Sequence, residues 1–193
     1  MNQKLILKYL KLFGLGFIIV SLIEFIDIIL LSTVIRMNMD GDNLSLIQVL
    51  FNTGLITIDG AFLWIVLMII PFIFIALGFI LISLAKKENL NRSILSKDIL
   101  LIGLFLLVGS FIKMVYIILL ANIKLNLGIT VELQQVMYNP LITPFIGAVM
   151  WIYIYGTTSG YLISGLIFGG VGLKWILIIE KEKPLKINDN SAK

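Results

Sequence analysis

Four long apolar stretches constrain this chain more than any other feature of its sequence. They run from about residue 12 to 35, 61 to 85, 99 to 121 and 146 to 173. A helix needs roughly 20 mainly apolar residues to cross a hydrocarbon core about 30 Å thick, and each stretch is long enough. Because 60% of the 193 residues are hydrophobic and only 13% are charged, a water-soluble fold could not bury enough apolar surface. The sequence therefore predicts an all-α polytopic membrane protein with four transmembrane helices.

The charges that flank these stretches predict the topology. Three lysines precede the first stretch, four basic residues lie in 86–98, and lysines recur in 175–193. The segments 36–60 and 122–145 hold one basic residue each. By the positive-inside rule, both termini are expected in the cytoplasm and the protein in the cell membrane. The same bias accounts for most of the net charge of +4, so that charge does not indicate nucleic-acid binding.

The two halves of the chain resemble each other as a tandem repeat. Residues 48–64 and 135–151 share Gln, Asn and Trp in register, and these residue types are scarce in the chain. The matched residues are Gln48, Asn52 and Trp64 in the first half and Gln135, Asn139 and Trp151 in the second. Since each unit holds two spans, both copies would have the same orientation. We expect a parallel (2+2) repeat of helical hairpins, with a pseudo-two-fold axis along the membrane normal.

The repeat also predicts the layout of the chain. The expected parts are a first hairpin over 1–87, a cytoplasmic linker over 88–98, a second hairpin over 99–174, and an interfacial turn with a charged tail over 175–193. The outer segments are expected to hold short amphipathic helices, near 45–52 and 132–139, or re-entrant pieces. Residues 40–43, Asp-Gly-Asp-Asn, favour a turn, because the later ligands of a calcium loop do not follow.

Three charged residues lie inside the predicted spans. Each costs about 2.5–3.5 kcal/mol at the centre of a membrane helix, so a lipid-facing position is disfavoured. Glu24 and Asp27 share one helix face, and Lys113 occupies the repeat position of Glu24. We therefore predict a Glu24–Lys113 pair. The whole predicted cluster is Ser21, Glu24, Asp27, Ser110, Lys113 and Tyr116.

The net charge of this cluster leaves two interpretations open. Two carboxyls against one ammonium give −1, so one carboxyl stays protonated or a cation binds there. The favoured interpretation is a structural ion pair that fixes helix register or contacts a partner subunit. The other is an ion-coupling site.

Small and polar residues follow one another along the fourth stretch. The spacing Gly156-x-x-x-Gly160-x-x-x-Ser164, with Gly165-x-x-x-Gly169, allows close approach of helices within the chain or between chains. The hydroxyls of residues 157–159 are expected to bond back to the helix backbone. Trp151, with the tyrosines at 153 and 155, is expected in an outer aromatic belt.

Composition narrows the function. The chain has no Cys and no His, which excludes thiolate nucleophiles, His-based catalysis and Cys- or His-ligated metals. We expect no cofactor, no metal site and no enzymatic activity. The favoured function is a small subunit or accessory protein in the lipid bilayer that acts by helix–helix association, as a homo-oligomer or with other membrane subunits. The alternative is a small proton- or cation-coupled transporter or channel that uses Glu24, Asp27 and Lys113.

Overall fold

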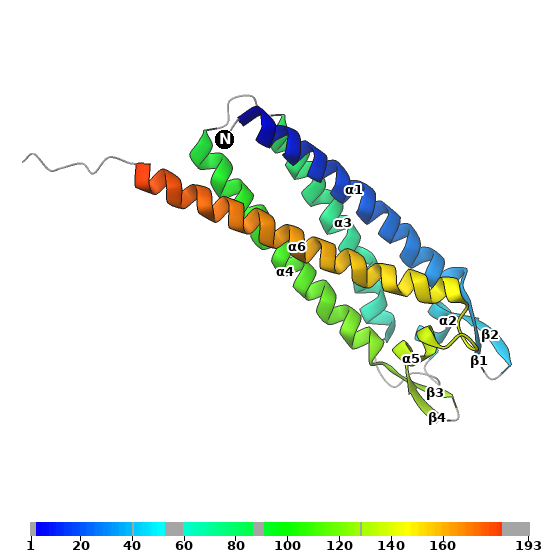
Figure 1. Cartoon of the computed structure of the whole chain (residues 1–193). Helices are drawn as coiled ribbons and strands as arrows, with labels where there is room; N and C mark the ends of the chain where they lie inside the picture. Colours follow the sequence, from blue (N-terminus) through cyan, green and yellow to red (C-terminus); the bar gives the residue numbers. More distant parts are fainter. Residues whose placement is uncertain (1–2, 40, 53–59, 87–90, 128, 183–193) are drawn as a thin grey trace, which may run out of the picture.

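Four long helices form an elongated bundle (Figure 1). The computed structural model describes residues 3–39, 41–52, 60–86, 91–127 and 129–182. The long helices are α1 (Gln3–Thr33), α3 (Gly60–Ala85), α4 (Arg92–Ala121) and α6 (Phe145–Glu182). By length and composition all four can cross a membrane, so the four predicted spans are present as helices and the fold is compatible with a multi-pass membrane protein.

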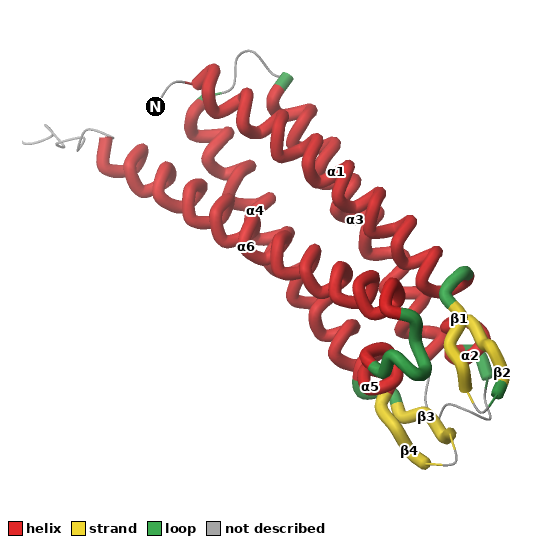
Figure 2. Tube along the Cα trace, turned by 45° about the vertical axis from the view of Figure 1, so that its right-hand side comes forward, coloured by secondary structure: helices red, strands yellow, loops and turns green. Residues whose placement is uncertain are grey.

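Each connection from α1 to α3 and from α4 to α6 contains a β-hairpin and a short helix. The first has β1 (Arg36–Met39), β2 (Asp42–Ser45) and α2 (Leu46–Leu50), and the second has β3 (Lys124–Leu127), β4 (Ile129–Glu132) and α5 (Leu133–Tyr138). Both lie at one end of the bundle, here called the hairpin end (Figure 2). The opposite end, where α1 begins and α6 ends, is the terminal end. The expected short helices are present, but the prediction of an all-α chain missed the four strands.

The first hairpin is built from a turn and an alternating pattern. The antiparallel register pairs Met39 with Asp42, and Gly41 in the turn has φ 90°, a conformation that favours glycine. Met37 and Met39 are buried while Asn38 is exposed, so the methionines of β1 face the core. Of the segment predicted as a turn, Gly41 lies in the turn, Asp42 and Asn43 belong to β2, and residue 40 lies outside the described residues.

Two glutamines hold the starts of the short helices. The backbone N–H of Ser45 donates to Gln48 Oε1 at 2.9 Å, and Ser45 Oγ accepts from the Gln48 N–H at 3.4 Å. In the second connection the backbone N–H of Glu132 donates to Gln135 Oε1 at 3.3 Å. Both glutamines therefore satisfy a backbone donor that a helix N-terminus leaves unpaired.

Glycines set the closest helix contacts, which join α1 to α3 and α4 to α6. A Cβ on Gly78 would lie 2.6 Å from the carbonyl oxygen of Gly14. In the second pair, a Cβ on Gly165 would lie 3.1 Å from the carbonyl oxygen of Gly103 and 2.8 Å from the nitrogen of Leu107. The backbones touch at both crossings, and a side chain there would force the helices apart.

Helix α6 is longer than the sequence predicts. An interfacial turn was expected over residues 175–179, but the helix continues through them to Glu182. No glycine or proline interrupts the chain between Leu173 and Glu182, so nothing in the local sequence stops the helix. Trp175 is 9% exposed and packs in the core at the terminal end.

The interior consists of two apolar clusters. The cluster at the hairpin end includes Trp64 and Trp151, both with no exposed surface. Trp151 is therefore a core residue, and its predicted place in an aromatic belt is wrong. The cluster at the terminal end includes Phe17 and Phe74. Outside, large apolar side chains cover the helices, as in helices that face lipid.

Candidate functional site

A buried ion pair lies between the two apolar clusters. Glu24 of α1 and Lys113 of α4 form a salt bridge, and neither side chain has any exposed surface. Along α1 the pair falls between Phe17 of the terminal-end cluster and Ile28 of the hairpin-end cluster. The predicted Glu24–Lys113 pair is confirmed.

The ammonium of Lys113 also contacts α6. It donates a hydrogen bond to Thr157 Oγ1 at 2.9 Å and lies 5.1 Å from the centroid of the Tyr161 ring. The Thr157 hydroxyl in turn donates to the carbonyl oxygen of Ile154 at 3.0 Å. One charged group on α4 is therefore bound by α1 and α6 at once.

Tyr161, on α6, links the ion pair to the remaining long helix, α3. Its hydroxyl donates to Glu24 Oε2 at 3.4 Å and shares a hydrogen bond of 2.7 Å with Ser21 Oγ. Its ring stacks on Phe74 of α3, with centroids 3.8 Å apart and planes 8° from parallel. Residues from all four long helices thus meet around the pair.

The remaining predicted members divide into two groups. Ser21 joins the network through Tyr161, and Asp27 lies one turn of α1 beyond Glu24. Ser110 is buried but donates to the carbonyl oxygen of Leu106 at 2.7 Å, so it does not reach the pair. Tyr116 forms no hydrogen bond or ion pair with the cluster in the described part of the chain.

Sequence reasoning missed three residues of the network: Phe74, Thr157 and Tyr161. The threonine was expected only to bond to its own helix. That holds for its neighbours Thr158 and Ser159, which donate to backbone carbonyls at 2.8 and 3.2 Å. Thr157 does the same and additionally accepts from Lys113. The signal that could have found it is the polar run on α6 at the depth of Lys113.

The residues matched in the predicted repeat serve packing and helix ends. Trp64 and Trp151 are fully buried, and the indole N–H of each has no hydrogen-bond partner among the described residues. Asn139 is the C-cap of α5, and its Oδ1 accepts from the N–H of Leu141 at 3.0 Å. Asn52 directly follows Phe51, the C-cap of α2.

The small residues of α6 do not share one role. Gly165 packs against α4, and the backbone of Gly169 occupies the space where a Cβ of Gly103 would lie. Gly156 and Gly160 are exposed, and a Cβ on either would have no atom within 4 Å. Ser164 donates to the carbonyl oxygen of Gly160 at 2.8 Å.

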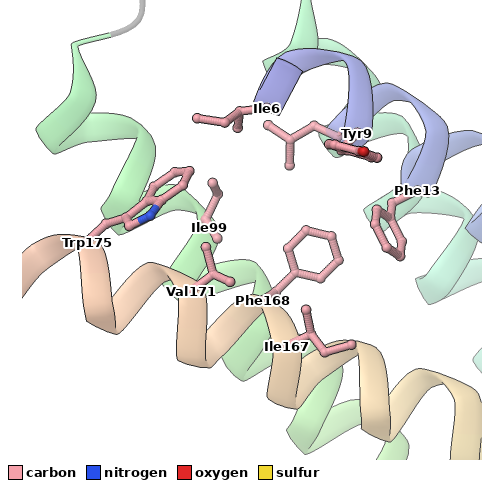
Figure 3. A pocket seen from close by; sticks show the side chains of 9 residues that line it. Ile6, Tyr9, Phe13, Ile99, Ile167, Phe168, Val171 and Trp175 are labelled. Carbon is pink, nitrogen blue, oxygen red and sulfur yellow. The ribbon is translucent and has the colours of Figure 1, made fainter. Parts of the chain in front are cut away.

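An apolar pocket of about 200 Å³ opens among α1, α4 and α6 toward the terminal end (Figure 3). Its nine lining residues are Ile6, Tyr9, Leu10, Phe13, Ile99, Ile167, Phe168, Val171 and Trp175. Almost all of its wall is apolar, so it suits a hydrocarbon chain and offers little to a polar substrate.

The described residues contain no group of three or more His, Cys, Asp or Glu side chains close enough to hold a metal ion. Comparisons with protein-family models, with curated proteins and with solved structures found no match to this chain.

Proposed function

We propose that the protein is a non-enzymatic, multi-pass membrane subunit that works by helix–helix association within the bilayer. The buried ion pair gives the four-helix bundle one fixed arrangement, and α6 offers a second face to a partner. The partner is another copy of the chain or another membrane protein.

The observation that carries this proposal is the open glycine face of α6. On one side of α6, the backbone of α4 occupies the space beside Gly165 and Gly172. Gly156 and Gly160 lie on the other side, exposed and with open space above them. Glycines at four-residue spacing allow two backbones to approach closely in a bilayer, where packing drives association. Helix α6 is also the least buried of the four spans.

The sealed environment of the ion pair supports a structural role for its charges. Both side chains are fully covered, and the ammonium is bound by a carboxylate, a hydroxyl and an aromatic ring. A path for ions would need these groups to meet water. Removal of one partner from a buried ion pair destabilises a protein by more than the intact pair stabilises it. The pair is therefore suited to fixing the register of the helices.

We also propose that the chain arose from two fused helical hairpins, related by a pseudo-two-fold axis along the membrane normal. The matching glycine crossings, Gly14 with Gly78 and Gly103 with Gly165, support this. So do the equivalent helix-capping glutamines and the two buried tryptophans described above. Basic residues concentrate at the terminal end, which supports cytoplasmic termini in a cell membrane.

The association is tested by cross-linking in native membranes. Because the chain has no Cys, a single Gly160→Cys variant gives one defined thiol. A matched control is Val108→Cys, on the exposed side of α4. We expect disulfide-linked dimers, or photo-cross-links from a thiol-attached probe to a partner, at position 160 well above those at 108. Equal yields at the two positions would contradict the proposal.

One observation favours the alternative of a proton-coupled transporter. Asp27 lies beside the pair with a buried oxygen that has no hydrogen-bond partner in the described part of the chain. Ion flux through the purified protein separates this alternative from the structural role.

A further inference from the structure

Asp27 is a carboxyl without a partner inside a membrane span. It lies three residues after Glu24 on α1, and its Oδ2 is buried with no hydrogen-bond partner among the described residues. No ion pair or hydrogen bond to either oxygen is present in that part of the chain. A carboxylate in such surroundings would lose its hydration without compensation.

The neighbouring groups do not supply a counter-ion. On α1, Glu24 carries the same charge. On α4, the ammonium of Lys113 is already bound by Glu24, Thr157 and the Tyr161 ring, and Tyr116 is a phenol that offers no cationic group. On α6, the titratable groups that face the cluster are Tyr153 and Tyr161, both phenols. Helix α3 contains no titratable side chain.

We propose that Asp27 is a proton-binding site and is a carboxylic acid in the folded, membrane-embedded protein. The proton brings the cluster to zero net charge, with Glu24 negative and Lys113 positive. A metal cation is a poorer occupant, because cations such as Ca²⁺ or Mg²⁺ need several oxygen ligands. The described residues contain no group of three or more His, Cys, Asp or Glu side chains that could hold such a cation. Between the two carboxyls that the sequence left open, the geometry thus assigns the proton to Asp27.

The site is open to the bilayer on one side. Asp27 is partly exposed, whereas Glu24 is fully covered. Ile23 and Leu30, one turn before and one turn after Asp27 on the same side of α1, are 50% and 39% exposed. We therefore expect an apolar reagent dissolved in the lipid to reach Asp27 from its exposed side, and not to reach the fully covered carboxyl of Glu24.

Dicyclohexylcarbodiimide tests both the proton and the access. The carboxylic acid gives its proton to one carbodiimide nitrogen, and the carboxylate oxygen adds to the central carbon. The resulting O-acylisourea rearranges to a stable N-acylurea that retains every atom of the reagent. We expect one adduct, located at Asp27 by peptide mass spectrometry of the full chain in liposomes. Labelling should fall as the pH is raised, and a water-soluble carbodiimide should not produce it.

Matched controls separate the outcomes. Asp27→Asn should abolish the adduct, and Glu24 should remain unmodified in the wild type. Glu180, exposed near the end of α6, should react with the water-soluble reagent instead. An adduct on Glu24, or none on Asp27, would overturn the proposal.

Infrared spectroscopy of wild-type protein with ¹³C-labelled aspartate provides a second measurement that needs no variant to fold. A carboxylic-acid C=O band that shifts with the label supports the proposal, and its absence at neutral pH overturns it. The proposal is independent of whether α6 associates with a partner, because cross-linking at position 160 does not involve Asp27.

Discussion

Replacement of Lys113 by methionine removes the ammonium from the buried network while keeping a side chain of similar length. The carboxylate of Glu24 would then remain fully buried, with the Tyr161 hydroxyl at 3.4 Å as its remaining hydrogen-bond donor. Removal of one partner of a buried ion pair typically costs about 3–5 kcal/mol. Because the unfolded reference state in a membrane also finds polar partners, we expect a value near the lower limit, about 3 kcal/mol.

The double variant Glu24→Gln/Lys113→Met makes the reasoning specific to the pair. It leaves no buried charge at these two positions, and the amide at position 24 can still accept from Tyr161. We expect it to be more stable than Lys113→Met alone, with an interaction free energy of about 2 kcal/mol in the cycle with Glu24→Gln. The assay is reversible unfolding in mixed micelles by SDS, followed by tryptophan fluorescence.

The matched control is Lys174→Met, at an exposed position on α6. Its unfolding free energy should stay within about 0.5 kcal/mol of the wild type. Additivity of the two single substitutions at 24 and 113 within about 0.5 kcal/mol would refute the inference that the pair stabilises the bundle.

Three further predictions follow from the glycines and from the topology. Gly78→Ala should destabilise the bundle by about 1–3 kcal/mol, because its Cβ would lie 2.6 Å from a backbone oxygen. Gly160→Ala, where the space is open, should be neutral or slightly stabilising. Equal effects of the two substitutions in SDS unfolding would contradict the crossing geometry. Gly41→Ala should cost about 1 kcal/mol because φ is 90° there, and an unchanged unfolding midpoint would show that the turn relaxes freely. In intact cells, a membrane-impermeant maleimide should label Asn43→Cys and not Lys181→Cys, and the reverse pattern would invert the proposed topology.

The spans and the ion pair could be predicted because both depend on large free energies. A long apolar stretch has few alternatives to a membrane helix, and a charge within it needs a partner. Glu24 and Lys113 were the opposite charges at similar depth, so their pairing did not require knowledge of helix rotation.

The strands and the contacts of α6 with Lys113 depend on smaller free energies, and the sequence did not predict them. The strands are four residues long, and their alternation is brief beside the helices. The Asp40-Gly41 pair was a hairpin signal, but it was interpreted only as a turn. Thr157 and Tyr161 belong to a run of polar residues that point to different sides of α6. Which of them reaches Lys113 is decided by the rotation of α6 against α4, which the close approach at Gly165 sets.

The length of α6 shows the limit of reasoning from a repeat. The end of the fourth span was expected near residue 174, where the second hairpin of the predicted repeat ends. Helix formation needs only a sequence without breakers, so α6 passes Lys174 and continues to Glu182. A repeat therefore predicts which residues correspond but does not decide where an individual helix stops.

We propose that the buried charges fix the helices in place and do not carry ions. The test is proton and cation flux into liposomes that contain the purified protein, with Asp27→Asn and Glu24→Gln/Lys113→Met measured beside the wild type. We expect that flux through the wild type does not exceed that of protein-free liposomes. Flux in the wild type that disappears in these variants while they remain folded would contradict the claim and favour the transporter.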